Sequence, residues 1–109
     1  MTRANFEPLK SLGFASISAS YAAVGTPSTH PVRAFCINNN TAGDMIFSRD
    51  NTLAAGELFI KAGSYKLWDI QSNRKTTNED KYLLDEGTQW YVKQSTAPVS
   101  GDVYIENLV

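Results

Sequence analysis

The chain has 109 residues, which is the length of one domain. Hydrophobic residues make up 42% and charged residues 19% of the chain, so it can form a core without a metal ion or a disulfide. Its single cysteine excludes an internal disulfide. Ten basic and eleven acidic side chains leave a net charge of −1, which argues against nucleic acid as a partner because phosphate binding needs a basic surplus.

Residues 1–10 mix charged and apolar side chains and show no strand or helix periodicity. We expect an N-terminal arm here, with residues 11–109 forming the folded domain. Phe6, Pro8 and Leu9 would anchor the arm on a neighbouring subunit. Its removal should then leave the melting of the isolated domain almost unchanged.

The next segments favour strands. Residues 12–23 alternate small apolar side chains with serines, which predicts one strand with a small-residue inner face; the serines also interrupt the apolar run that a secretory signal would need. Apart from Arg33, residues 32–37 are apolar on both faces, which is typical of a central strand. Cys36 within them should be a small buried side chain. The three asparagines at 38–40 predict a turn, and residues 45–48 predict a short strand.

Further strands are predicted towards the C-terminus. Residues 58–60 and 65–70 should form a pair joined by a turn at 61–64, and a polar loop should fill 72–81. Short strands are expected at 82–84, 89–94 and 103–105. Trp68 and Trp90 alternate with apolar neighbours, so both should pack in the core.

Three tyrosines, Tyr65, Tyr91 and Tyr104, fall on outward faces of these strands. Exposed tyrosines are enriched in protein interfaces, and they can also stack on sugars. The sequence leaves both uses open.

The fold predicted from these elements is all-β: a single antiparallel β-sandwich, immunoglobulin-like or jelly-roll-like, of about seven or eight strands with an N-terminal arm. No run approaches the roughly 18 apolar residues of a membrane span, so no membrane partner is expected.

No constellation for catalysis or metal binding is present in the sequence. His30 is the only histidine and stands between Thr29 and Pro31, without a nucleophile elbow elsewhere. One histidine and one cysteine cannot supply a zinc site, and the carboxylates lack the spacing of a calcium loop. We therefore expect a protein that is not an enzyme and has no cofactor.

Six segments between residues 33 and 109 occur in an order that resembles small structural virion proteins of tailed bacteriophages. They are residues 35–40, 46–51, 53–56, 68–73, 85–93 and 101–105. The resemblance implies a non-enzymatic part of the particle, located in the virion and made in the host cytoplasm. The place would be the neck or collar, a head–tail joint, or, as an alternative, the capsid surface as a decoration protein.

The partners implied are other virion proteins, whether portal, connector or capsid, and copies of the same chain in a ring or lattice. A carbohydrate-binding β-sandwich is the alternative from another functional class. The candidate interface residues are Phe6, Pro8, Leu9, Tyr65, Tyr91 and Tyr104.

Overall fold

A computed structural model of the chain describes residues 6–69 and 84–109. Its only helix in these ranges is the three-residue 3₁₀ helix η1 (Phe14–Ser16), and no helix there has the length and hydropathy that a membrane span requires. The described residues form eight strands: β1 (Lys10–Gly13), β2 (Ala22–Ala23), β3 (Ala34–Thr41), β4 (Met45–Ser48), β5 (Leu58–Ile60), β6 (Tyr65–Asp69), β7 (Tyr91–Gln94) and β8 (Gly101–Leu108). The predicted all-β fold is confirmed.

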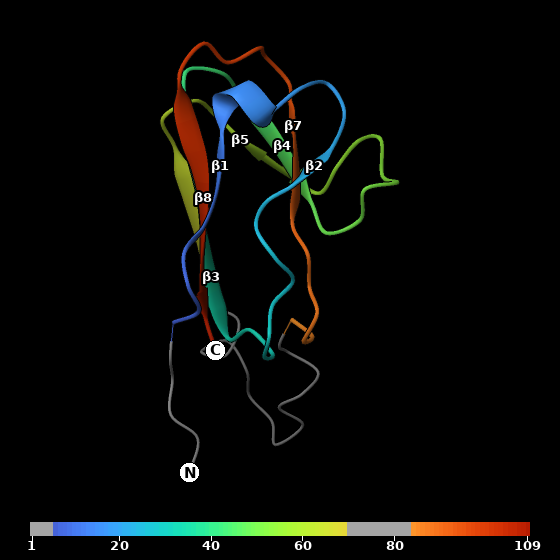
Figure 1. The fold of residues 1–109 in the computed structure, drawn as a ribbon, viewed down its shortest axis with the longest axis vertical. Coiled ribbons are helices and arrows are strands. Elements are labelled where there is room, and N and C mark those ends of the chain that lie inside the picture. Colours follow the sequence, from blue (N-terminus) through green and yellow to red (C-terminus); the bar gives the residue numbers. More distant parts are fainter. Residues whose placement is uncertain (1–5, 70–83) are drawn as a thin grey trace.

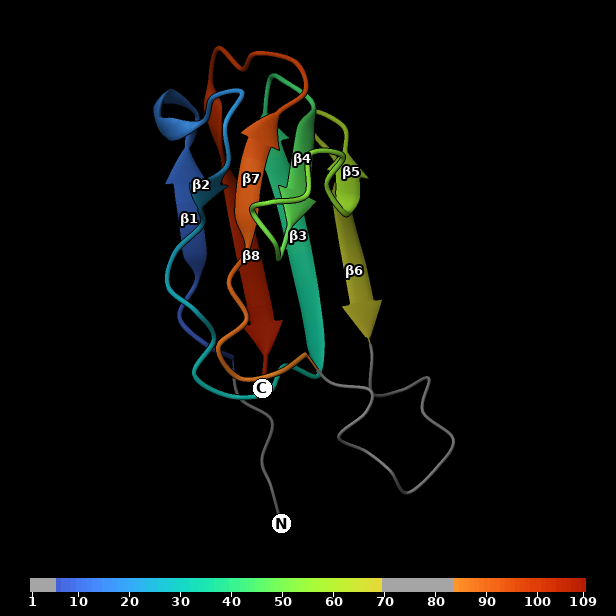
Figure 2. The same ribbon diagram turned by 90° about the vertical axis from the view of Figure 1, so that its right-hand side faces the viewer.

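The strands form two antiparallel sheets that pack face to face (Figures 1 and 2). The first sheet has the order β1-β8-β3-β6, and the second has the order β2-β7-β4-β5. Among the strands of the described residues, only β4 and β5 are both consecutive in the chain and neighbours in one sheet. Every other pair of consecutive strands there is divided between the two sheets, so the chain wraps around a common core.

The core lies between the two sheets and consists of the side chains that alternate inward. Its buried apolar members are Ile17, Val24, Val32, Phe35, Ile37, Met45, Phe47, Ile60, Trp90, Val92, Val103 and Ile105. Trp68 is partly buried against this cluster and stacks on Phe35, with 5.0 Å between ring centroids. The predicted core packing of both tryptophans is therefore confirmed.

The predicted single strand over residues 12–23 is wrong. β1 ends at Gly13, the η1 turn follows, and only Ala22 and Ala23 form β2. Between them the hydroxyl of Ser18 accepts a hydrogen bond from the backbone N–H of Ser20 at 3.2 Å. Serine side chains compete for backbone groups in this way, so alternation of small residues with serines does not sustain a strand.

Two predictions about turns and pairing are also wrong. The three asparagines at 38–40 lie inside β3, because the Asn39 amide finds hydrogen-bond partners in the interior and the strand continues to Thr41. β5 and β6 do not pair: β5 pairs with β4, and β6 pairs with β3. The connection between them crosses the sandwich, where Gly63 N–H donates to the Asn39 carbonyl at 2.8 Å.

The predicted loop at 72–81 and most of the predicted strand at 82–84 lie outside the described residues. Leu84, the last of them, forms an isolated bridge with Val32. The strand predicted at 103–105 is part of the longer β8, which pairs along its length with β3.

The structure does not show the predicted arm over residues 1–10. Residues 1–5 lie outside the described ranges, and Lys10 is the first residue of β1. Phe6 forms a bridge with Leu108, and Glu7 N–H donates to the Asn107 carbonyl at 3.0 Å. Because these backbone groups pair with β8, residues 6–10 belong to the sandwich, and their deletion would remove part of its edge.

Glu7 has a buried carboxylate that bonds to side chains or backbone in three segments of the chain. Its Oε2 accepts hydrogen bonds from Thr29 N–H at 2.6 Å and from the Thr29 hydroxyl at 2.7 Å. Its Oε1 accepts one from the Asn107 amide at 3.0 Å and lies 3.9 Å from the Lys10 ammonium. Burial alone would raise the pKa of Glu7, but these bonds and the lysine outweigh it and hold that pKa below its ordinary value.

Glu7→Gln should therefore reduce stability at neutral pH and remove part of its pH dependence. A carboxyl whose pKa is lowered by folding stabilises the native state above its ordinary pKa, and this contribution disappears as the pH falls through the lowered value. Melting temperatures from pH 7 to pH 2 check this. The wild type should exceed the variant at pH 7 and converge with it well below pH 4.5, the ordinary value; a constant difference would contradict the role of the ionised carboxylate.

Candidate interaction surface

The outer face of the first sheet carries the side chains that alternate with the core. Ile37 and Ile105 point inward and are paired, so their neighbours in sequence point outward. The outward residues of the three strands β3, β8 and β6 include Ala34, Cys36, Asn38, Asn40, Asp102, Tyr104, Glu106, Leu108, Tyr65 and Leu67.

Four large hydrophobic side chains are exposed on or beside this face. Tyr65 and Leu67 on β6 are each 65% exposed. Phe6, which bridges to Leu108, is 73% exposed, and Leu9 precedes β1 at the same edge. These side chains occupy the two opposite edges of the sheet, and half-buried Cys36 and Leu108 lie between them, so the face is a candidate for contact with another molecule.

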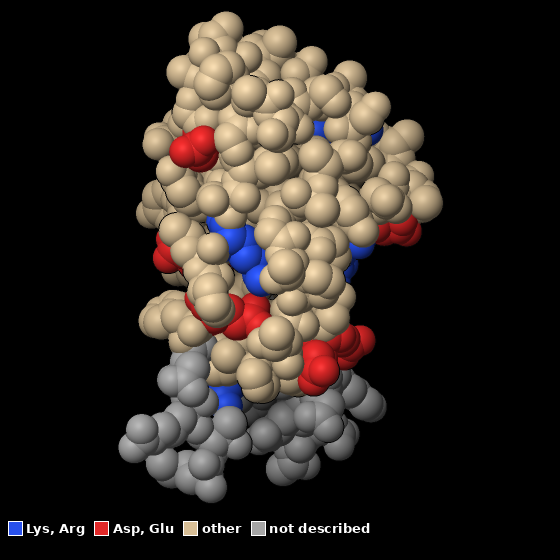
Figure 3. All heavy atoms as spheres, viewed as in Figure 1, with Lys and Arg blue, Asp and Glu red and all other residues tan. Residues whose placement is uncertain are grey.

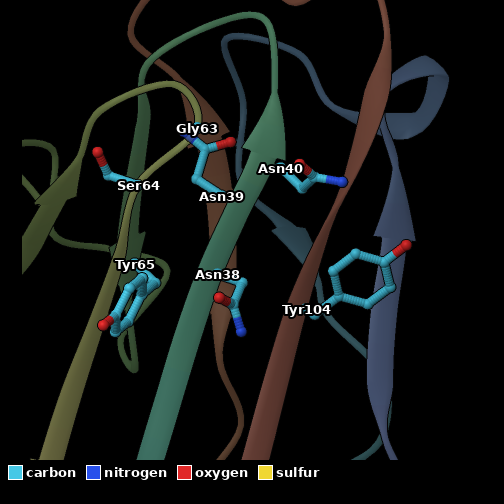
Figure 4. A pocket seen from close by; sticks show the side chains of 7 residues that line it. All are labelled: Asn38, Asn39, Asn40, Gly63, Ser64, Tyr65 and Tyr104. Atoms are coloured by element: carbon cyan, nitrogen blue, oxygen red, sulfur yellow. The ribbon is translucent and has the colours of Figure 1, made fainter.

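A hollow lies over β3 on the same face, with a volume of about 250 Å³ (Figure 4). Its walls are Asn38, Asn39, Asn40, Gly63, Ser64, Tyr65 and Tyr104. The strand register explains its shape, because Tyr104 on β8, Asn38 on β3 and Tyr65 on β6 stand opposite one another. The hollow is therefore polar in the middle and has a tyrosine on each side.

Two carboxylates orient the polar groups of the hollow. The Tyr104 hydroxyl donates to Asp102 Oδ2 at 3.0 Å, which raises the pKa of Tyr104. The Asn38 amide donates to Glu106 Oε1 at 3.3 Å. Both side chains are thus held in one orientation over the sheet.

Cys36 lies on this outer face and is half-buried, so the prediction of a buried side chain is wrong. The physical reason is the alternation of β3, which points Phe35 and Ile37 inward and therefore turns Cys36 outward. Partial burial raises the pKa of its thiol, and the nearby charge of Glu106 raises it further.

Native Cys36 should therefore react slowly with a disulfide reagent such as DTNB. At pH 8 we expect labelling at least about tenfold slower than in urea-unfolded chain, because only the thiolate is nucleophilic and folding reduces its fraction. Glu106→Gln should accelerate labelling of the native chain. Equal rates for native and unfolded protein would contradict the raised pKa.

The structure separates Tyr91 from the other two predicted tyrosines. It faces outward from β7 on the second sheet, where its ring meets Tyr21 edge-on at 6.4 Å. The connection from β4 to β5 folds over this side, since the Tyr21 hydroxyl donates to the Leu53 carbonyl at 2.6 Å and Lys93 donates to the Ala54 carbonyl. Tyr91 therefore lies on the opposite side of the sandwich from Tyr65 and Tyr104.

Five of the six candidate interface residues lie on or beside the outer face of the first sheet, and Tyr91 lies on the other sheet. Tyr65 and Tyr104 share the hollow, Phe6 and Leu9 lie at the β1 edge, and exposed Pro8 lies between these two. Leu67 and the outward asparagines were missed. Leu67 could have been identified, because it is two residues after Tyr65 in the same strand and so shares its outward face. The asparagines were not identified because they were assigned to a turn.

Possible metal ligands do not cluster among the described residues. No group of three or more histidine, cysteine, aspartate or glutamate side chains among them could hold a metal ion. His30 lies in an exposed loop, where its Nδ1 is 3.0 Å from the Thr29 hydroxyl. On the face drawn in Figure 3, acidic and basic groups are scattered among uncharged ones.

Comparison with known proteins gives no match: no family model, no curated protein and no solved structure is similar to this chain at a significant level. The resemblance to phage virion proteins thus remains an expectation from the sequence motifs.

Proposed function

We propose that this chain is a non-enzymatic structural subunit of a tailed-bacteriophage particle, at the neck or collar or at the head–tail joint. The order of the six motifs from residue 33 to residue 109 supplies the class of protein. The strand orders β1-β8-β3-β6 and β2-β7-β4-β5 are those of a jelly roll, an architecture that occurs in viral capsid domains and in lectins. Fold alone does not fix function, so the proposal depends on a surface.

The observation that carries the proposal is the set of exposed hydrophobic side chains on the outer face of the first sheet. Leu67 and Phe6 are exposed there at opposite edges of the sheet, and half-buried Cys36 and Leu108 lie between them. Burial of such side chains against a portal, connector or capsid protein, or against another copy of the chain, would stabilise an assembly. Identical contacts between copies would close a ring or repeat in a lattice.

Leu67→Glu tests the proposal, with Leu53→Glu as the matched control. Both leucines are exposed, but Leu53 lies on the connection from β4 to β5, over the second sheet. Each tagged variant is expressed during infection by the phage that encodes the chain, and the purified particles are analysed by immunoblot. We expect Leu53→Glu to be incorporated like the wild type and Leu67→Glu to be lost from particles.

Absence of the wild-type chain from particles would overturn the structural class. Normal copy number of Leu67→Glu would exclude this face as the docking surface. Electron microscopy of the particle would distinguish a neck or collar position from the alternative of a capsid decoration protein.

A further inference from the structure

We propose that the hollow over β3 is a binding site for a neutral saccharide of about two rings. This site lies on the face proposed for docking and shares Tyr65 with it but not Leu67, so it would be accessible in the isolated chain, on which it can be tested separately.

The spacing of the two tyrosines suits a short oligosaccharide. Tyr65 on β6 and Tyr104 on β8 stand opposite the same residue of β3, Asn38. Two strand spacings separate them, which is roughly 9–10 Å. A saccharide lying across both β3 and β8 would therefore reach both rings and cover the asparagine between them (Figure 4).

The tyrosine rings offer apolar faces to the C–H faces of sugar rings. Figure 4, which looks onto the outer face of the sheet, shows the ring of Tyr104 beside β8 on the side of β1, with its face towards the viewer. Tyr65 also borders a second hollow of about 350 Å³ together with Phe59 and Lys66, so solvent reaches it from two sides. A rigid aromatic side chain with a polar tip provides contact area at little cost in conformational entropy.

The polar groups of the hollow match sugar hydroxyls. Asn38 and Asn40 point outward from β3, and each amide supplies both donors and an acceptor. Ser64 adds a hydroxyl at the end of the hollow nearest Gly63. Because Glu106 already orients the Asn38 amide, less side-chain freedom is lost when a ligand binds.

The charges around the site select neutral ligands. None of the residues that line this hollow is lysine or arginine, and the carboxylates of Asp102 and Glu106 contact its walls. A phosphate, sulfate or sialic acid group would therefore meet negative charge without a cationic partner. Hexoses and N-acetylhexosamines carry no such charge and present hydroxyls and amides that the asparagines can bind.

The test uses the full chain and an array of neutral, sialylated and sulfated glycans. The best neutral oligosaccharide is then titrated into ¹⁵N-labelled chain, with affinity expected near ~1 mM for so open a site. Shifts should be confined to the signals of Asn38, Asn40, Ser64 and the tyrosines. Tyr65→Ala should weaken binding at least about tenfold, whereas Phe6→Ala, an exposed aromatic on the same face but outside the hollow, should bind within about twofold of the wild type.

Any of three results would overturn the proposal: no shift with any neutral glycan at ~10 mM, shifts centred away from the hollow, or binding of acidic glycans alone. An unchanged affinity in Tyr65→Ala would do the same. If that variant does not give a native spectrum, Asn40→Ala replaces it, since Asn40 is exposed and its truncation should weaken binding without unfolding the chain. Loss of Leu67→Glu from particles tests the other proposal and does not affect this outcome.

Discussion

Trp90→Ala should lower the free energy of unfolding by about 3–5 kcal/mol. Trp90 is 4% exposed and lies in the core between the sheets, with its ring centroid 5.3 Å from that of Phe35. Alanine would remove most of this buried area and leave a cavity that β3 and β7, each paired on both sides, cannot collapse to fill. Urea unfolding followed by far-UV circular dichroism measures the loss without depending on tryptophan fluorescence.

Phe59→Ala is the matched control for this experiment. Phe59 is an aromatic residue of β5, but it faces outward from the second sheet and is 44% exposed. Its replacement should cost less than about 1 kcal/mol, because little buried area is lost. A loss in Trp90→Ala as small as that of the control would mean that Trp90 does not pack in the core.

The burial of Trp90 could be predicted from the sequence because the signal is local. Residues 89–94 alternate, which predicts that Trp90 shares a face with Val92 and not with Tyr91. In the structure Trp90, directly before β7, and Val92 are buried, whereas Tyr91 is half-buried. The same local rule predicted β4 and β6 and the outward direction of Tyr65 and Tyr104. Period-two alternation needs no knowledge of which strands pair.

The pairing of strands could not be predicted in this way. Residues 58–60 and 65–70 are close in sequence and separated by turn residues, which is typical of a hairpin, yet β5 and β6 belong to different sheets. The choice between a hairpin and a crossing depends on contacts with β4 and β3, which lie elsewhere in the chain. Tyr65 and Tyr104 lie close to each other only because β6 and β8 pair with β3 in this register, which is a long-range property. The sequence therefore predicted two outward tyrosines but not that they border the same hollow.

Asn39→Ala should lower the free energy of unfolding by about 3 kcal/mol. The Asn39 side chain is buried, and its amide donates to the carbonyls of Gly43 and Ile60, each at 2.9 Å. Its Oδ1 accepts from the Thr41 hydroxyl at 2.6 Å and from Thr41 N–H at 3.1 Å. Alanine would leave these buried groups short of partners, and each such group costs about 1–3 kcal/mol, partly recovered by relaxation.

Asn40→Ala is the matched control, because it removes an asparagine side chain that lies outside this buried hydrogen-bond network. Asn39 and Asn40 are neighbours in β3, but alternation points the first into the sandwich and the second into solvent. The exposed replacement should change stability by less than about 0.5 kcal/mol in the same urea titration. Equal losses in the two variants would contradict the inward network, and they would support the turn that three consecutive asparagines predict from sequence alone. We expect the two variants to differ in stability because only the Asn39 side chain bonds to other segments: its amide binds the Gly43 carbonyl in the β3–β4 turn and the Ile60 carbonyl of β5. These bonds connect the two sheets. An apolar side chain at this position could not donate to either carbonyl.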